Sequence, residues 1–130
     1  NYNSIDDEGA RELGKNTSWT DLQIIELNSN SITDEGVAEL CKNKTWTHLQ
    51  RLELGNNSIN AEGAAELGKN IGGTYFKLQL IDDRGAVALS KNNTWTNLKR
   101  LDLVSNTVSE KGEAELRKNV NWPKKLDIWY

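Results

Sequence analysis

The sequence predicts an α/β solenoid, a stack of repeated strand–helix units, and three observations predict it. Five glycines recur at steps of 27, 27, 22 and 27 residues, and four tryptophans at steps of 27, 49 and 27, so one unit is short by five residues. Residues 16–42 and 43–69 share sixteen identities in twenty-seven positions. Repetition at such a period is the signature of a solenoid, in which each unit buries its apolar face against its neighbours. The recurring residues are Gly9, Gly36, Gly63, Gly85 and Gly112, and Trp19, Trp46, Trp95 and Trp122.

The first half of each unit has the pattern of a β-strand. In the second unit, Leu52 and Leu54 alternate with charged residues, the period-two pattern of a half-buried strand. Similar segments begin at residues 22 and 98. An asparagine follows each strand where the chain turns into the core, and its side-chain amide can satisfy backbone groups of its own and the neighbouring unit. These ladder positions are Asn3, Asn30, Asn57 and Asn106.

The second half of each unit has the pattern of an α-helix. A capping residue precedes acidic residues in most of the first turns, and a lysine stands near the end, which is the charge order that a helix dipole favours. The asparagine that follows can end the helix in the left-handed conformation. The repeated glycine lies in the first turn, where it would allow close approach of helix to strand. The capping residues are Thr33, Asn60, Asp82 and Ser109, the lysines are Lys15, Lys42, Lys69, Lys91 and Lys118, and the asparagines are Asn16, Asn43, Asn70, Asn92 and Asn119.

The third unit, residues 70–85, departs from this pattern because it lacks both the tryptophan and the ladder asparagine. If the five missing residues belong to the loop before the strand, Thr74 and Phe76 point inward. If they belong to the turn after it, Leu78 and Leu80 do. Both alignments are open, and we slightly favour the first, because it keeps the spacing of the second unit and lets Gln79 partly replace the asparagine. This irregularity predicts a weak point or a kink in the solenoid.

The pattern Leu-x-x-Leu-x-Leu-x-x-Asn-x-Ile, followed by a helix that carries Glu-Gly-Ala, resembles the leucine-rich-repeat family. A period of 27 residues with a full helix is most similar to its ribonuclease-inhibitor-like class. The resemblance covers essentially the whole chain. It implies a curved horseshoe segment with a parallel sheet on the concave face and helices on the convex face.

The chain of 130 residues is expected to form a single leucine-rich-repeat domain, residues 1–130, of about four to five repeats. The amino end starts within a unit, and the carboxyl end stops in a strand that contains Trp129 and Tyr130. Neither end has the pattern of a polar cap, and terminal units need capping. We therefore expect a fragment, or a small solenoid whose uncapped ends permit self-association.

Composition and charge argue against several classes of partner. The net charge is −3, and no basic stripe is available to replace phosphate counterions, so nucleic acid is not an expected partner. The same acidity argues against an anionic membrane surface, and no apolar run approaches the length of a membrane span. A single cysteine excludes an internal disulfide.

Residues capable of catalysis are scarce, so the sequence predicts a protein that is not an enzyme and needs no cofactor or metal. The one histidine, His48, stands at a loop position that carries Asp21 and Asn97 in other units, which is typical of a surface residue. Cys41 stands where other units have glycine, serine or arginine, and we expect this position to face outward or a shallow groove. No metal-ligand spacing and no phosphate-binding glycine loop is present.

The tryptophans of the helix-to-strand loops permit two interpretations. In the first, the rings cover helix ends and neighbouring loops, with each indole nitrogen bonded to a carbonyl. In the second, they form a partly exposed aromatic rim that contacts sugar or protein. The first is the more common use of such residues.

The strand face is the most informative surface. Residues between the inward-pointing leucines must face outward, and the middle position is acidic in the three regular units. Neighbouring acidic residues about 5 Å apart repel, and Arg51 and Arg100 could offset this diagonally. This face is either a solvated, self-compensating surface or a patch that recognises a partner with basic or hydrogen-bonding groups. The predicted partner-binding residues are Ile24, Glu26, Asn28, Arg51, Glu53, Asn56, Lys99, Arg100, Asp102 and Val104.

The favoured function is a protein–protein interaction module that binds a protein partner through its concave strand face. The alternatives are the recognition arm of a larger enzyme or effector, and a self-associating structural spacer. The unpaired cysteine and the resemblance favour a cytoplasmic location, with a secreted or host-delivered protein as the alternative.

Overall fold

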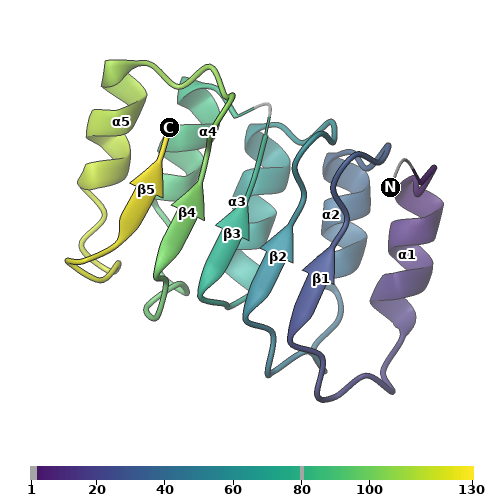
Figure 1. Ribbon diagram of the computed structural model, residues 1–130. Helices are drawn as coiled ribbons and strands as arrows, with labels where there is room; N and C mark the ends of the chain where they lie inside the picture. The colour runs from purple at the N-terminus through teal and green to yellow at the C-terminus, as the bar shows by residue number, and fades with distance from the viewer. Residues whose placement is uncertain (1–2, 80) are drawn as a thin grey trace.

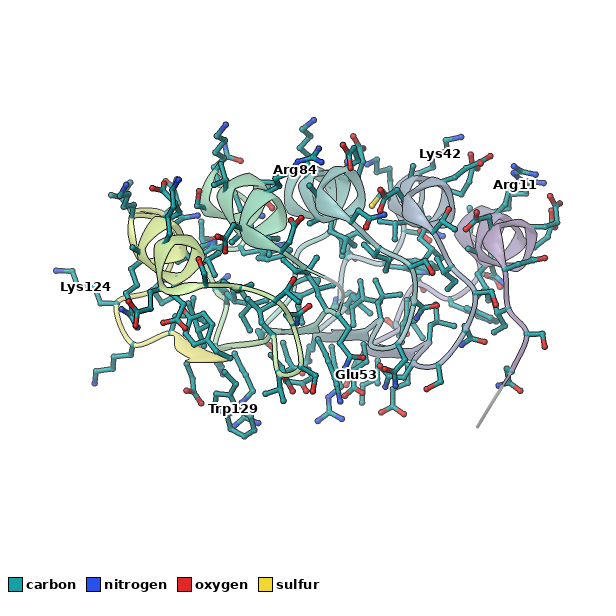
Figure 2. The ribbon with its side chains drawn as sticks, turned by 90° about the horizontal axis from the view of Figure 1, so that it is seen from above. Arg11, Lys42, Glu53, Arg84, Lys124 and Trp129 are labelled. Atoms are coloured by element: carbon teal, nitrogen blue, oxygen red, sulfur yellow. The ribbon has the colours of Figure 1, made fainter. Side chains whose placement is uncertain are left out.

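A computed structural model describes residues 3–79 and 81–130, and within them five helices alternate with five strands. The strands form one parallel sheet in the order β1-β2-β3-β4-β5, so each crossover passes through a helix. The sheet lies on one side of a gently curved stack and the helices on the other (Figures 1 and 2). The predicted α/β solenoid is confirmed. The elements are α1 Asp7–Lys15, β1 Ile24–Glu26, α2 Asp34–Cys41, β2 Arg51–Glu53, α3 Ala61–Asn70, β3 Tyr75–Lys77, α4 Asp83–Ser90, β4 Arg100–Asp102, α5 Glu110–Arg117 and β5 Asp127–Trp129.

The core runs without a break between the sheet and the helices. Each strand contributes its central residue, and Leu52, Phe76 and Leu101 pair side by side across β2, β3 and β4. All three are buried, as are the helix residues Leu67 and Leu89 that face them across the core. Because each unit touches only its neighbours, the sheet and helix rows share this burial along the whole stack.

The asparagine ladder is confirmed for three rungs. The Oδ1 of Asn57 accepts a hydrogen bond from the backbone N–H of Ile32 in the preceding unit, at 3.0 Å. Its Nδ2 donates to the carbonyls of Leu27 at 2.7 Å and Leu54 at 3.1 Å. Asn30 and Asn106 likewise accept from the N–H groups of Ile5 and Ile81 in the preceding units and donate to the carbonyls of Leu27 and Leu103 in their own units. One side chain thus satisfies backbone groups of two units that the turn after the strand leaves without partners.

The third unit has lost residues on both sides of its strand, so neither predicted alignment is right. Phe76 pairs with Leu52 in the sheet, which makes Phe76 and the buried Leu78 the inward-pointing pair. Thr74 is therefore not an inward strand residue, and Leu80 lies outside the described residues. Leu52 of the second unit comes nine residues after position 43, but Phe76 comes only six residues after the equivalent position 70, so three residues are missing before the strand. In the second unit position 59 comes five residues after position 54, whereas in the third unit position 81 comes three residues after position 78, so two residues are missing after the strand.

Gln79 does not replace the missing asparagine rung, contrary to the prediction. Its Oε1 accepts from the backbone N–H of Asn56 at 2.5 Å, on the outer side of the turn after β2. A ladder residue accepts from the N–H that follows the preceding unit's own ladder position, as Asn57 does from Ile32 N–H, and Asn56 N–H is not that donor. The two-residue deletion after β3 places Gln79 too near the strand to reach that position.

Aspartates form a second ladder at the helix N-termini. Asp7, in the first turn of α1, accepts from the N–H and the hydroxyl of Thr33 at 2.8 and 2.7 Å and from the N–H of Gly36 at 3.0 Å. Asp83 accepts from Ser109 in the same way before α5. The corresponding position in α3 is Ala61, and α4 is capped by its own Asp82, which accepts from the N–H of Gly85. Unpaired N–H groups at each helix start explain why an acidic residue recurs there.

Acid should weaken this aspartate ladder, and the sign follows from the pKa shifts. Burial opposes ionisation of Asp7, but the hydrogen bonds from Thr33 and Gly36 outweigh it and hold its pKa below the ordinary value of 3.8. The hydroxyl and N–H of Ser109 likewise lower the pKa of Asp83. A lowered folded-state pKa contributes stability that is complete above the unfolded-state value and is lost as pH falls through the folded one. We therefore expect the urea midpoint to drop below about pH 4.

In the double variant Asp7→Asn and Asp83→Asn, the difference between the urea midpoints at pH 7 and pH 3 should be smaller than in the unmodified protein. It should not vanish, because Lys42 also lowers the pKa of Glu39, which still loses its stabilising charge in acid. Asp21→Asn is the control, since its side chain is 95% exposed. A double variant with the unmodified pH dependence would show that the ladder makes no ionic contribution.

The asparagines after the helices do not adopt the left-handed conformation that was predicted. Among the described non-glycine residues, only Ser29, Asn56 and Ser105 have positive φ, and all three lie in the turns after strands. Asn43 instead folds its side chain back, and its Oδ1 accepts from the N–H of Thr45 at 2.8 Å. Its Nδ2 donates to the carbonyl of Gly14 in α1 at 3.0 Å. Asn92 donates to the carbonyl of Gly68 and Asn119 to that of Asn92, so these three asparagines join successive helix ends as a third ladder.

The glycine of the first helical turn is required by a close contact, although not with the strand as predicted. A Cβ on Gly63 would lie 2.8 Å from Cγ2 of Ile59 and 2.5 Å from Oδ1 of Asp34. Equivalent pairs of neighbours crowd Gly36 and Gly112. The residue two positions after the ladder asparagine and the capping aspartate of the preceding unit therefore exclude a side chain here.

The position of Cys41 faces the core and not the outside, which corrects the prediction. Cys41 is buried, and burial raises the pKa of its thiol to about 12. Gly14 occupies the same position in α1, where a Cβ would meet the backbone of Glu39 in the next helix. Packing between neighbouring helices explains why this position carries small residues in four units.

Cys41 should therefore be unreactive in the folded protein. Alkylation by iodoacetamide needs the thiolate, which the raised pKa suppresses at pH 8, so labelling should follow unfolding. We expect labelling to appear in urea together with the loss of the circular dichroism signal. Cys41→Ser supplies the unlabelled control, and rapid stoichiometric labelling of the folded chain would contradict the buried placement.

Candidate functional site on the concave strand face

The outward-facing residues of the five strands form two rows across the sheet. The pairing register aligns the first residues of the strands in one row and the third residues in the other. Glu53 and Trp129 extend from this side of the molecule, and Arg11, Lys42 and Arg84 extend from the helices on the opposite side (Figure 2). The first row is Ile24, Arg51, Tyr75, Arg100 and Asp127, and the second is Glu26, Glu53, Lys77, Asp102 and Trp129.

Arginines and aromatic rings alternate along this face. The guanidinium of Arg51 lies 5.2 Å from the ring centroid of Tyr75. The guanidinium of Arg100 lies 5.9 Å from the same ring and 4.1 Å from that of Trp129. Distances within about 6 Å give an attractive cation–π interaction. We call Arg51, Tyr75 and Arg100 of the first row, together with Trp129 of the second, the cation–aromatic row, and it spans strands β2 to β5.

Carboxylates hold the two arginines from the side. Arg51 Nη1 lies 3.6 Å from Glu26 and 3.7 Å from Glu53, which confirms the predicted diagonal offset of these acids. Arg100 pairs with Asp127 at 3.7 Å and not with Asp102. Such exposed pairs contribute little to stability, but together with the rings they restrict where the guanidinium groups can lie.

The acidic column that was predicted on this face is not continuous. Lys77 of β3 stands between Glu53 and Asp102 in the row and separates their charges. Asp102 is buried, and its Oδ1 accepts from the backbone N–H of Val104 at 3.0 Å. The Tyr75 hydroxyl donates to its other oxygen at 3.5 Å, and burial together with the nearby Glu53 and Asp102 raises the pKa of Tyr75. Asp102 therefore holds Tyr75 and the backbone at Val104 in place by hydrogen bonds and is not accessible to a partner.

The remaining predicted site residues divide between the face and its edges. Ile24 and Val104 are 50% and 42% exposed and leave apolar surface on the sheet side. Asn28 is bonded to Glu53 at 2.6 Å and to the N–H of Gly55 at 2.8 Å, so it orders the turn. Asn56 is exposed at the tip of its turn, and exposed Lys99 precedes β4 beside a shallow depression of the loop edge.

Sequence reasoning missed four residues of this face, namely Tyr75, Lys77, Asp127 and Trp129. The first two lie on β3, and alternation leaves them facing outward in both alignments of the third unit, but neither alignment placed them beside the residues of β2 and β4 with which they pair. The other two lie on β5, whose Leu126 and Ile128 carry the leucine-type alternation and could have placed them. Alternation with Phe76 places Tyr75 outward, but no signal in the sequence places it between Arg51 and Arg100, because its register depends on a deletion divided between two loops.

The loop tryptophans differ from one another in the structure. Trp95 is fully buried, stacks on Phe76 with centroids 4.2 Å apart, and donates from Nε1 to the carbonyl of Ile71 at 2.6 Å. Trp122 stacks 6.2 Å from Trp95 and donates to Asn92. The covering interpretation is confirmed for these two. Trp19 is 45% exposed, and among the described residues the buried Nε1 of Trp46 finds no hydrogen-bond acceptor.

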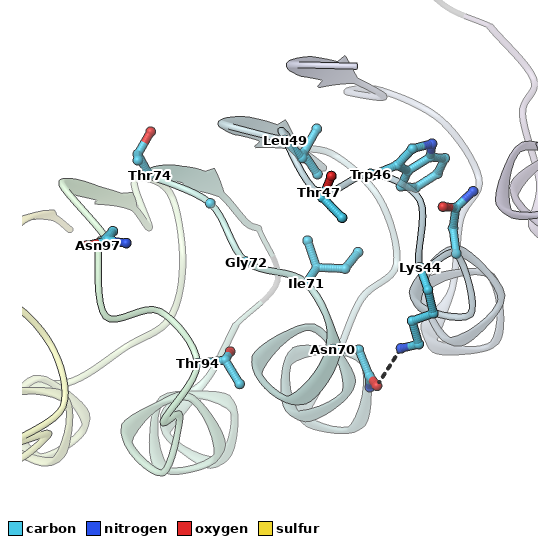
Figure 3. Close-up of a pocket in the computed structure, with 12 residues that line it drawn as sticks. Lys44, Trp46, Thr47, Leu49, Asn70, Ile71, Gly72, Thr74, Thr94 and Asn97 are labelled. Carbon is cyan, nitrogen blue, oxygen red and sulfur yellow. Dashed lines mark hydrogen bonds between the residues drawn. The ribbon is translucent and has the colours of Figure 1, made fainter. Parts of the chain in front are cut away.

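A pocket of about 380 Å³ opens at the helix-to-strand loops of the second, third and fourth units. Trp46 and Ile71 lie on one side of it and Thr94 and Asn97 on the other, and Lys44 Nζ donates to Oδ1 of Asn70 at 3.2 Å (Figure 3). We call it the loop pocket. Its lining is Asn43, Lys44, Trp46, Thr47, Leu49, Asn70, Ile71, Gly72, Gly73, Thr74, Thr94 and Asn97.

Within residues 3–79 and 81–130, no three or more His, Cys, Asp or Glu side chains are grouped so that they could hold a metal ion. In the same part of the chain, no helix has the length and apolar character needed to cross a membrane. His48 lies exposed in its loop, as predicted, with Nδ1 3.2 Å from the carbonyl of Thr20.

Comparison with known proteins agrees with the architecture. Residues 20–41 and 47–68 each match the family described as Leucine Rich repeat, whose members are typically non-enzymatic and whose repeats generally serve as protein-interaction modules. No curated protein matches the chain. The two matches cover the first and second strand–helix steps, and the parallel sheet extends the same arrangement to the other units. Two of the units thus match leucine-rich repeats, and the strand–helix units of the described residues stack as an α/β solenoid.

Proposed function

We propose that this protein binds a protein partner through its concave strand face, with the cation–aromatic row at the centre of the contact. The single observation that supports this most is the alternation Arg51, Tyr75, Arg100 and Trp129 across four neighbouring strands. Arginine, tyrosine and tryptophan are the residues that most often carry the binding energy of protein interfaces. A single sheet presents all four on one side.

The row is ordered before a partner arrives. Each guanidinium is restrained by an aromatic ring and a carboxylate, and the strands that carry them are packed on a buried core. Side chains that are already ordered lose less conformational entropy on binding, so more of the contact energy appears as affinity. Apolar surface at Ile24 and Val104 borders the row and can exclude water from its edges.

The charges of the face indicate a partner surface of mixed polarity. Three cations and four carboxylates stand in the two rows, and most of them pair with one another. A partner must therefore present groups that pair with the cations and groups that pair with the carboxylates, because a surface of one charge alone would not match this face. The period of 27 residues with a full helix also supports membership of the ribonuclease-inhibitor-like class.

The experiment is a selection of binders from a displayed library of random peptides, with the chain immobilised by a terminal tag. Trp129→Ala and Arg51→Ala should each weaken the selected peptides by at least tenfold, or about 1.4 kcal/mol. Arg84→Ala on the helix side is the matched control, because its side chain is exposed and lies on the opposite face. Thermal melts check that each variant is folded.

Peptides whose affinity survives both strand-face changes would contradict the proposal, as would equal losses with Arg84→Ala. Selection of no binder from a library that yields binders to a control protein would also count against it. A melt unchanged by Trp129→Ala, combined with lost binding, supports the row as a contact surface.

A further inference from the structure

Two loop indoles, those of Trp95 and Trp122, each donate to a residue at the start of the preceding unit, just after a helix ends. Trp95 of the fourth unit donates to the carbonyl of Ile71, which follows α3 directly. Trp122 of the fifth unit donates to Oδ1 of Asn92, two residues after α4. Both indoles therefore lie across the junction between two units, with the N–H directed toward the earlier one.

In the second unit, the corresponding residues are Asn43 and Lys44, which follow α2. The third unit should supply the indole that lies against them, but its loop is three residues short and contains no tryptophan. The loop pocket opens at this place, and Asn43 and Lys44 are part of its wall. The deletion thus leaves open a position that an indole fills at the next two junctions.

From this placement we infer that the loop pocket binds an indole ring. The volume of about 380 Å³ lies within the range of small-molecule sites, at its lower end. Trp46, Leu49 and Ile71 supply apolar walls, and Asn70, Thr94 and Asn97 supply polar groups at the rim. A flat apolar ring with one N–H donor fits this combination, and the ring can come from a free indole compound or from the tryptophan of a protein.

Gly72 offers a way to fill the pocket without disturbing the fold. A Cβ at Gly72 would meet no atom within 4 Å, and no described glycine has positive φ, so a side chain is sterically allowed. Gly73 is unsuitable, since a Cβ there would lie 3.2 Å from Cζ of Phe76. Gly72→Leu should project a side chain into the space that the indole would take.

The test is a titration of the 15N-labelled chain with N-acetyltryptophanamide, followed by the amide signals of Gly72 and Gly73 and the indole signal of Trp46. We expect saturable shifts at these three groups, weakened at least tenfold by Gly72→Leu and unaffected by Asn121→Leu, a change at an exposed loop residue. N-acetylphenylalaninamide, which has no ring N–H, should bind at least threefold more weakly. A short peptide with one central tryptophan distinguishes the sources: tighter binding than the amide identifies a protein tryptophan, and equal binding identifies a free indole compound.

Several outcomes would overturn the inference. They are shifts that fail to saturate with both probes, shifts of equal size in Gly72→Leu, shifts centred on the exposed Trp19, and phenylalanine binding as tightly as tryptophan. Because the loop pocket and the strand face are separate sites, Trp129→Ala should leave this titration unchanged, so failure of one proposal does not entail failure of the other.

Discussion

Trp95→Ala should lower the free energy of unfolding by about 3–5 kcal/mol, the largest loss expected from any single change in this chain. The indole is fully buried, stacks on Phe76 at 4.2 Å and lies 6.2 Å from Trp122. Removing it opens a cavity at the junction of the third and fourth units and leaves the carbonyl of Ile71 without its donor. The third unit is already short, so it has few other atoms with which to close the gap.

Urea unfolding followed by circular dichroism measures this effect. Trp19→Ala is the matched control, because this residue stands at the same repeat position with its ring 45% exposed, and its loss should cost less than about 1 kcal/mol. The loss of unfolding free energy in Trp95→Phe should lie between those of Trp95→Ala and Trp19→Ala, since phenylalanine keeps an aromatic ring but has no Nε1 donor. Equal midpoints for Trp95→Ala and Trp19→Ala would show that the stack beside the third unit does not support the fold.

Asn57→Ala should cost about 2–4 kcal/mol, because one side chain satisfies backbone groups of two units. Its loss leaves the N–H of Ile32 and the carbonyls of Leu27 and Leu54 without their partner, inside a turn from which water is excluded. Asn57 is only 2% exposed, so solvent cannot replace the bonds without rearrangement. A buried polar group without a partner costs more than the net value of the bond that it lost.

Thermal and urea melts of Asn57→Ala should be compared with those of Ser58→Ala, a change at the adjacent exposed residue. Hydrogen exchange should locate the damage, with faster exchange at the Ile32 and Leu54 amides and little change in β5, since each unit contacts only its neighbours. A loss of stability no larger than that of Ser58→Ala would mean that the ladder is dispensable.

Much of this fold follows from local chemistry that repeats. The leucine alternation places Leu52 and Leu54 inward. The backbone of the buried turn after the strand needs hydrogen-bond partners, and the asparagine side chain supplies them. The acidic first turn follows from the unpaired N–H groups of a helix start, although its use to cap the next helix and not its own was not predicted. These features recur because each unit meets nearly the same neighbours.

The candidate site was less accessible from the sequence, because it depends on how the irregular unit pairs. Ile24, Arg51, Arg100 and Glu26 were placed on the strand face correctly. Asp102 was placed there too, but it is buried and accepts hydrogen bonds from the N–H of Val104 and from Tyr75 of the neighbouring strand. Charge reversal at Asp102 would therefore test folding and not recognition, so Arg51 and Trp129 are the informative positions.

By itself, the sequence determined the α/β solenoid, its period, the inward leucines and the asparagine ladder, because these depend on contacts that are the same at every step along the chain. Only the tertiary structure decided the register of β3, and with it the cation–aromatic row and the loop pocket. A strand's register is set by hydrogen bonds and packing against both neighbours at once, and a five-residue deletion can be divided between two loops in several ways that local pattern does not distinguish. The pairing of Phe76 with both Leu52 and Leu101 selects one division of the deletion, with three residues missing before β3 and two after it.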